Sequence, residues 1–216
     1  MFNSLTILEE TASFVAIDKP AGVPTIPDRF GSPSVHDQLS AARGERLWVV
    51  HRLDREVTGI LLFARNAVAH RHLSMAFEQH KVSKAYEAWT SGDPPDPTAL
   101  LHWESNLLRG KKRSYVHPAG KPAITDAQFW GVTETGQLRF VLTPQTGRNH
   151  QLRVHLANAG YPICGDALYG SPAPWRPGEI ALRAIALRVA PGVLGRGELD
   201  LRAPALAPYL QVDSNL

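Results

Sequence analysis

The segment from Thr58 to Ala64 (TGILLFA) constrains the fold of this chain more than any other. It is a continuous apolar run of strand length without alternation, so it predicts a strand that is buried on both faces. The polar segment 50–57 comes directly before this run. Its side chains are therefore expected beside a rigid, buried strand, which is a favourable place for a functional site.

Periodicity and turn residues predict the other elements of the amino-terminal part. A helical pattern over 67–80 offers Val68, Met75, Ala76 and Phe77 as an apolar face. The remaining elements predicted here are a strand at 13–17 (SFVAI) that ends in loop 18–22, a short helix at 35–43, and a strand at 84–89.

Proline and glycine mark the boundaries in the rest of the chain. Segment 91–97 (SGDPPDP) cannot continue regular structure, and we interpret it as the joint between two lobes. Gly136 lies in the turn of a predicted hairpin with strands at 127–132 and 138–142. Beyond it, the pattern predicts a helix at 149–158 closed by Gly160, a long loop at 165–178, and apolar segments near 180–189.

The composition suits one globular domain with a core. Of the 216 residues, 44% are apolar and 20% are charged, which suits a folded chain better than a disordered one. We expect residues 1–216 to form a single domain, with two lobes around a cleft. The one cysteine, Cys164, allows neither an internal disulfide nor a cysteine-based metal cluster, which favours a reducing cytoplasm.

The chain has no segment typical of membrane or exported proteins. It contains no apolar run of about 18 residues, and its first residues (MFNSLTILEETASF) lack the layout of a secretion signal. We therefore expect a cytoplasmic protein without a membrane partner. The net charge is +3, with a basic run at 109–113 (RGKKR). Such a run permits a polyanionic partner, although a solvated loop would have the same composition.

The most informative chemistry lies at 51–59 (HRLDREVTG), where Asp54 stands between Arg52 and Arg55 just before the apolar run. Nearby cations keep a carboxylate ionised, as a nucleophile requires. On charge pattern alone, the alternative is a surface or structural ion pair.

The wider sequence resembles the RluA-type RNA pseudouridine synthases, whose central signature is His-Arg-Leu-Asp followed by a Thr/Ser-Gly step and an apolar strand. Residues 51–64 reproduce this signature. Any one such motif could arise by chance, but several in the family's order are specific. The other blocks that agree are 18–22 (DKPAG), 84–86 (KAY), 146–155 (TGRNHQLRVH) and 160–170 (GYPICGDALYG).

The chain departs from the family pattern at two places. Val57-Thr58 stands where Thr-Ser is more frequent, and we expect this to alter only loop packing. Leu182-Arg183-Ala184 stands where Leu-His-Ala is common, which puts any role of that histidine in doubt for this chain.

The resemblance implies an α+β fold: a mixed, mostly antiparallel, curved sheet flanked by helices, with an RNA-binding cleft across its middle. It implies an isomerase that detaches uracil from its ribose and rejoins it through carbon, with no metal, nucleotide or redox cofactor. The chain begins almost at the catalytic blocks. We therefore expect no separate amino-terminal RNA-binding domain of the kind that some relatives carry. We also expect the protein to be a monomer.

By resemblance, Asp54 is the nucleophile, and a carboxylate suits a reaction that develops positive charge on a sugar. Arg153 aligns with an arginine that pairs with the nucleophile; the alternative is an arginine on an exposed helix face. Tyr86 aligns with a tyrosine that stacks on uracil and can accept a proton; the alternative is a packing residue on a strand.

The same resemblance suggests contacts with RNA. A uridine in a folded stem-loop of transfer or ribosomal RNA must be flipped out to react, and Arg52 is the candidate to brace the gap. Leu182 could contact the flipped base, or be an ordinary core leucine. Arg148 is a candidate for a phosphate or a helix-start contact, and the basic residues Lys111, Lys112 and Arg113 are candidates for phosphate contacts.

Other functions find less support in the sequence. His70 and His72 are two residues apart and His150 and His155 are five apart, so neither pair has the i, i+4 spacing of a helical zinc motif. We interpret His51 and His150 as structural hydrogen-bonding residues. A glycoside hydrolase would need a second carboxylate, but Asp18 and Asp166 belong to loops that look structural. A non-catalytic RNA-binding protein would not need Asp54, Tyr86 and Arg153 together.

Overall fold

The computed structural model describes residues 5–28 and 31–206. Within them, eleven strands form one sheet, with the order β1-β2-β4-β10-β5-β9-β8-β6-β7, and with β11 and β3 beside β10 and β4. The strands are β1 Thr6–Glu10, β2 Phe14–Lys19, β3 Trp48–Val49, β4 Thr58–Ala64, β5 Val82–Thr90, β6 Leu101–Arg109, β7 Ser114–Val116, β8 Lys121–Val132, β9 Leu138–Pro144, β10 Leu182–Val189 and β11 Leu199–Arg202.

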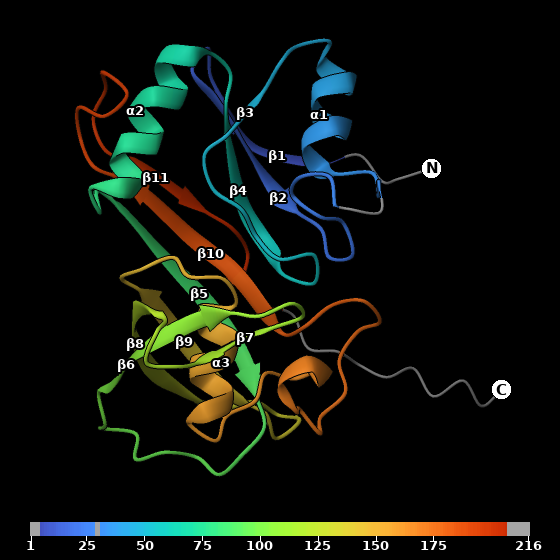
Figure 1. The fold of residues 1–216 in the computed structure, drawn as a ribbon, viewed down its shortest axis with the longest axis vertical. Helices are drawn as coiled ribbons and strands as arrows, with labels where there is room; N and C mark the ends of the chain where they lie inside the picture. The colour runs from blue at the N-terminus through green and yellow to red at the C-terminus, as the bar shows by residue number, and fades with distance from the viewer. Residues whose placement is uncertain (1–4, 29–30, 207–216) are drawn as a thin grey trace, which may run out of the picture.

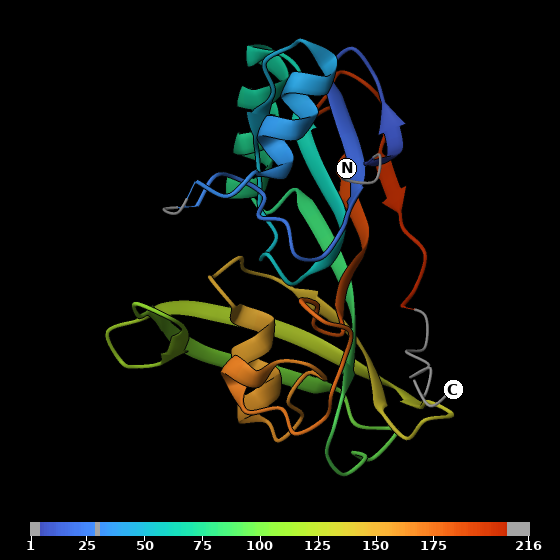
Figure 2. The same ribbon diagram turned by 90° about the vertical axis from the view of Figure 1, so that its right-hand side faces the viewer.

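Three α-helices, α1 Val35–Arg43, α2 Ala67–Glu78 and α3 Gln151–Asn158, and the short 3₁₀ turn η1 Ala167–Tyr169 accompany the sheet. The sheet divides into an upper half around β1–β4 and a lower half around β6–β9 (Figure 1). All three α-helices lie on the same side of the long strands β5 and β10 (Figure 2). Only the β4–β10 pairing is parallel among the strand pairs of the described residues. The predicted α+β fold with a mixed, mostly antiparallel sheet is therefore confirmed.

β4 is the buried strand that the apolar run predicted. All of its residues are buried, and it pairs with β2, β3 and β10. At its start, Gly59 has φ +104 and faces Ala184 of β10 so closely that an added Cβ would lie 2.2 Å from the Ala184 carbonyl oxygen. Only glycine combines this backbone conformation with so close an approach.

β5 and β10 connect the two halves of the sheet. β5 pairs with β10 through Val82–Ala88 and with β9 through Tyr86–Thr90, so the two pairings overlap at residues 86–88. Segment 91–97 instead lies in the connection from β5 to β6, at the bottom of the lower half (Figure 1). The joint between the halves is therefore this pair of strands and not 91–97, since hydrogen-bonded strands continue across the middle. That residues 1–216 form a single domain stays a prediction.

α2 buries only part of the face expected from the sequence: Ala76 is buried and Phe77 packs against the core, but Val68 and Met75 do not belong to the buried face. Its buried residues are Ala69, Leu73 and Ala76, whereas Val68 is 65% exposed and Met75 is 41% exposed. Val68 and Met75 lie one position before Ala69 and Ala76, and one position turns a helix by about 100°. The helix also ends at Glu78 because His80 takes a left-handed conformation with φ 56.

The other predicted elements are present with small shifts of their ends. Ser34 caps the start of α1, where its side chain accepts a hydrogen bond from the Asp37 backbone, and Gly44 caps its end with φ 62. β8 and β9 form the predicted hairpin, with Gly136 at φ 84 in its turn. No helix in the described part of the chain is long and apolar enough to span a membrane.

We expect Gly59→Ala to lower the free energy of unfolding by about 3 kcal/mol or more, because the added Cβ must displace β10 and the backbone is strained. Gly136→Ala is the matched control, since that glycine also has a positive φ but nothing lies within 4 Å of an added Cβ. Its cost should be about 1–2 kcal/mol. Denaturant unfolding measures both, and equal losses would contradict the steric argument.

Candidate active site

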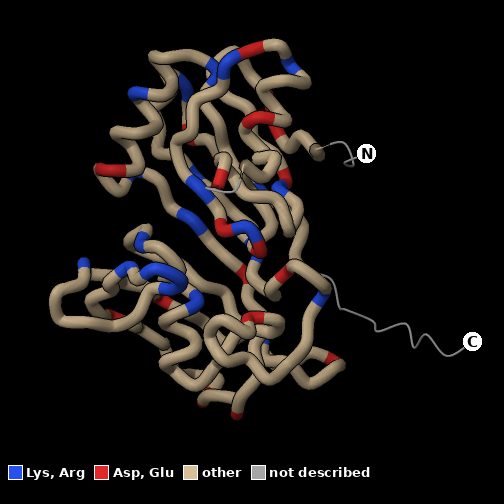
Figure 3. The backbone as a smooth tube through the Cα atoms, turned by 45° about the vertical axis from the view of Figure 1, so that its right-hand side comes forward, with Lys and Arg blue, Asp and Glu red and all other residues tan. Residues whose placement is uncertain are grey.

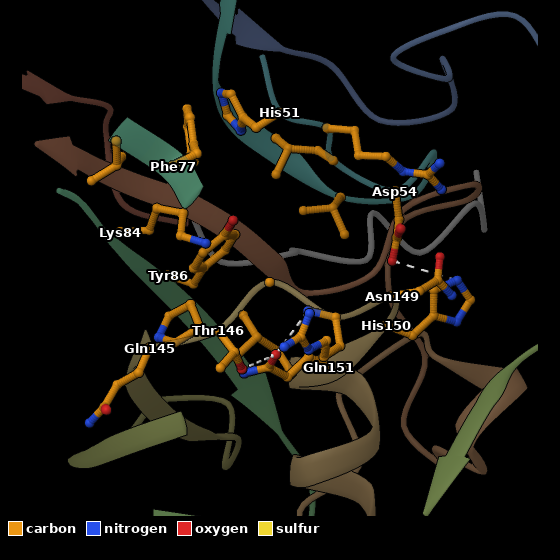
Figure 4. A pocket seen from close by; sticks show the side chains of 18 of the residues that line it. His51, Asp54, Phe77, Lys84, Tyr86, Gln145, Thr146, Asn149, His150 and Gln151 are labelled. Carbon is orange, nitrogen blue, oxygen red and sulfur yellow. Dashed lines mark hydrogen bonds and ion pairs between the residues drawn. The ribbon is translucent and has the colours of Figure 1, made fainter. Parts of the chain in front are cut away.

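A cleft of about 640 Å³ opens between the two halves of the molecule. Its walls are loop 50–57, the end of α2, the first part of β5, loop 144–150 and the first turn of α3. Figure 4 shows side chains from these segments pointing into it. Residues that are far apart in the sequence therefore meet here, including Asp54, Tyr86 and Arg153.

Asp54 lies on the loop that connects β3 to β4. Its carboxylate is 19% exposed, 3.4 Å from Arg153 Nη1 and 3.8 Å from His150 Nε2. The Asp54 carbonyl accepts a hydrogen bond from the Val57 backbone, which closes a turn. The side chain is thus open to the cleft while positive charge lies on its inner side.

Loop 50–57 is held from behind by loop 18–25. Thr25 Oγ1 donates to the Leu53 carbonyl (2.9 Å) and accepts from the Leu53 backbone nitrogen (3.1 Å). Lys19 is fully buried, and its ammonium donates to the carbonyls of Pro20, Val23 and Arg55 at 2.7–3.1 Å. Burial lowers the pKa of Lys19 to about 8, although the charges of Glu56 and Asp54 oppose this.

Arg153 is the buried cation of the site, with 3% exposure. Its Nε and Nη2 donate to the two carboxylate oxygens of Asp166 at 2.7 and 2.8 Å. Its Nη1 faces Asp54 at 3.4 Å and Glu56 at 3.5 Å. Burial alone would lower the pKa of this guanidinium, but the three carboxylates raise it. The expectation of an Arg153–Asp54 contact is confirmed, and the exposed-face alternative is wrong.

Tyr86 lies on β5 and points into the cleft (Figure 4). Burial raises the pKa of its phenol, and the negative charge of Asp54 raises it further. Tyr86 therefore carries its proton at neutral pH. Such a ring can stack on a base and donate a hydrogen bond.

His150 was interpreted from the sequence as a structural residue, and the structure adds that it lies next to Asp54. It has φ 54, and its Nδ1 is 3.0 Å from the Tyr169 hydroxyl. The Tyr169 hydroxyl in turn donates to the Ser114 carbonyl. Burial lowers the pKa of His150, so its ring is neutral near pH 7 despite the opposing charge of Asp54.

The predicted RNA-contacting residues separate into two groups. Arg52, Arg148 and Leu182 line the cleft, with both arginines exposed and Leu182 3% exposed. Lys111, Lys112 and Arg113 are exposed on the turn between β6 and β7 and do not line it. Figure 3 shows Lys and Arg on both sides of the gap between the halves. Arg109, at the start of the same basic run, does line the cleft, whereas Lys111, Lys112 and Arg113 can contact only a ligand that extends beyond it.

Sequence reasoning missed several residues that the fold brings into the cleft, among them Lys84, Gln145 and Thr146. A usable signal existed for Lys84, since residues two apart on a strand share a face and Tyr86 was already a candidate. The role of Asp166 was also missed, because its partner Arg153 lies on a separate element. Its loop does have a structural role, as expected.

Arg183 occupies the place where relatives often have histidine. Its Nη2 contacts Asp18 Oδ2 at 2.5 Å, and its Nε donates to the Pro204 carbonyl at 2.6 Å. The arginine thus links β10 to the start of loop 18–22. Within the described residues, no group of three or more metal-ligating side chains is present.

Comparison with known proteins places this site in a family. The family model described as RNA pseudouridylate synthase matches residues 13–158. An uncharacterized RNA pseudouridine synthase of Zymomonas mobilis is 38% identical over 186 residues, which cover 83% of this chain and 84% of the relative. The dual-specificity RNA pseudouridine synthase RluA of Escherichia coli is 32% identical over 174 residues, covering 78% of each chain.

A solved structure shares the fold. Human RNA Pseudouridylate Synthase Domain Containing 1 superposes with a TM-score of 0.78 at 24% sequence identity, covering 93% of this chain and 83% of the human one. The family match and the relatives agree with the sequence blocks that meet in the cleft. This chain therefore belongs to the RluA-type RNA pseudouridine synthase family.

Proposed function

We propose that this protein converts specific uridines of folded RNA to pseudouridine, with Asp54 as the nucleophile. Family membership supports uridine isomerisation in RNA as the reaction. The observation that carries the assignment of Asp54 is its position: a carboxylate open to the cleft, on a braced loop, 3.4 Å from the buried Arg153. RNA binding alone would not need this arrangement.

The reaction places opposite charges on the two parts of the nucleoside. When the bond between N1 and C1′ breaks, positive charge develops on the sugar, and the Asp54 carboxylate can stabilise that charge or bond to C1′. Removal of a ribose proton is the other route open to the same carboxylate. On either route, Arg153 holds the carboxylate ionised and aimed, because its own position is fixed by Asp166.

Tyr86 faces the base in this scheme. Its ring stacks on uracil inside the cleft, where the raised pKa keeps the phenol protonated before the substrate binds. To accept the proton that leaves C5, Tyr86 would need a nearby positive charge to favour its phenolate.

The RNA reaches the cleft with its target base flipped out of the helix. Arg52 braces the vacated position and Leu182 packs below the base, since both line the cleft. Arg148 and the basic run Lys111, Lys112 and Arg113 contact phosphates on either side. We expect the targets to be stem-loops of transfer or ribosomal RNA, and the protein to act in the cytoplasm as a monomer without metal or cofactor.

Cells that lack this protein should lose pseudouridine at one or a few sites of transfer or ribosomal RNA. Wild-type protein should restore those sites, whereas Asp54→Ala should lower the rate by roughly 10⁴-fold or more, as removal of a nucleophile does in other enzymes. Site-by-site pseudouridine mapping measures this, with Asp93→Ala as the control for an exposed aspartate. Equal restoration by Asp54→Ala would refute the assignment of the nucleophile.

Asp166→Ala should slow the reaction by about 10- to 100-fold, because Arg153 then loses the partner that orients it. The same change leaves a buried guanidinium less compensated and should cost about 3 kcal/mol of stability. Single-turnover rates and denaturant unfolding test both effects, and Asp166→Asn, which keeps the side chain's shape, gives a better-folded comparison. Asp200→Ala on β11 is the exposed control; a wild-type rate for both Asp166 variants would contradict this role.

Replacing Lys111, Lys112 and Arg113 together by alanine should weaken RNA binding and reduce the slope of log affinity against log salt by about 2–3. The rate at saturating RNA should not change, because these side chains lie outside the cleft. The control replaces Arg188, Arg196 and Arg202, which are exposed elsewhere, and so removes the same charge. Equal weakening by both variants would mean that net charge, and not this loop, attracts RNA.

A further inference from the structure

Lys84 lies in the cleft and has no part in the scheme above. It stands on β5 two residues before Tyr86, so both side chains leave the same face of the strand. Both line the cleft, and Figure 4 shows them at one end of it with Asp54 at the other. An added Cβ on Gly147, across the cleft, would lie 3.7 Å from the Lys84 ammonium.

The Lys84 ammonium is partly buried without a compensating partner. Within the described part of the chain it makes no ion pair or hydrogen bond, and its surroundings include the neutral ring of His51 and the apolar Phe77. Desolvation lowers the pKa of this ammonium and is the only cause of its shift. A cation in this position costs folding free energy, and such groups concentrate at functional sites.

Among the described residues, the cleft therefore presents a carboxylate, backed by Arg153, at one end and an unpaired ammonium at the other. The Asp54 end presents a carboxylate, and the end with Lys84 and Tyr86 presents a cation beside an aromatic ring. This polarity matches the reaction, which makes the sugar positive and the departing base negative. Fixed charges aimed at developing charges in a cleft shielded from water contribute strongly to catalysis.

We propose that Lys84 donates a hydrogen bond to a carbonyl oxygen of the target uracil and stabilises the negative charge on the base when its bond to ribose breaks. This inference rests on the proposed function. The electron pair of the N1–C1′ bond stays on uracil and spreads over N1, O2 and O4. After rotation, C5 bonds to C1′, C5 loses its proton, and N1 takes one up, so the product is an isomer of the substrate.

A phosphate contact is the other use of a lysine in an RNA-binding cleft. The exposed cations Arg52 and Arg148 at the rim suit that purpose. Lys84 lies farther in, beside Tyr86, where a flipped base would enter. A uracil carbonyl at this place would supply the acceptor that the ammonium lacks.

The test compares Lys84→Met, which keeps the length and removes the charge, with Lys84→Arg and with the exposed control Lys81→Met. The substrate is a stem-loop RNA that carries a uridine already shown to react with the wild-type protein. Single-turnover rates at saturating enzyme should fall by about 10²- to 10³-fold for Lys84→Met. RNA affinity should stay within about twofold, because no phosphate contact is lost. Lys84→Arg should recover part of the rate, and Lys81→Met should match the wild type.

Stability gives an independent readout. Removal of an uncompensated buried charge should leave the melting temperature of Lys84→Met at or above that of the wild type. A lysine needed for the fold would give the opposite shift. A rate loss accompanied by a lowered melting temperature in both Lys84 variants would therefore assign Lys84 to structure and overturn the proposal.

A second substrate tests the charge argument directly. Fluorine at C5 of uridine withdraws electrons and stabilises the uracil anion, so the base should depend less on Lys84 for its departure. The ratio of wild-type to Lys84→Met rates, measured as loss of the substrate nucleoside in one turnover, should shrink severalfold with 5-fluorouridine RNA. An unchanged ratio, or a defect confined to RNA affinity, would overturn the proposal. Failure of the wild type on every RNA would instead refute the proposed function.

Discussion

The buried fork between Arg153 and Asp166 is the interaction on which the site depends. Asp166 is 1% exposed and binds Arg153 through both carboxylate oxygens, so the guanidinium is fixed before it reaches Asp54. Breaking such a pair costs about 3–5 kcal/mol because the remaining charge stays buried, although forming it contributes little net stability. The main effect of the pair is therefore to position the Arg153 guanidinium. It connects α3 and the loop after α3 to the loop that carries Asp54.

The two long strands β5 and β10 form the framework on which the site is built. β5 and β10 connect the two halves of the sheet, and the pairings on either side of β5 overlap at residues 86–88, which include Tyr86. The cleft thus has a rigid floor, with Lys84 and Tyr86 on one strand and Asp54 on a loop fastened by Thr25 and Lys19. Because these parts are held by hydrogen bonds, the charges at both ends of the cleft can be set before a substrate arrives.

Sequence patterns predicted local structure well where the signal was local. The uninterrupted apolar run of β4, the capped helix α1 and the hairpin turn at Gly136 all follow from residues close to one another. The errors arose where packing against a distant element decided the outcome. The buried face of α2 is set by the strands beneath it, so Val68 and Met75 are exposed although their spacing is helical.

By itself, the sequence determined part of the fold, including β4, α1 and the β8–β9 hairpin. It also determined the family blocks and the identity of Asp54, Tyr86 and Arg153 as candidates, because motif order and short-range pattern are properties of the chain. Only the tertiary structure decided that Asp166 orients Arg153, that His150 lies 3.8 Å from Asp54, and that Lys84 carries an uncompensated charge into the cleft. These facts depend on contacts between residues far apart in the sequence. Burial and charge compensation exist only after folding has brought such residues together.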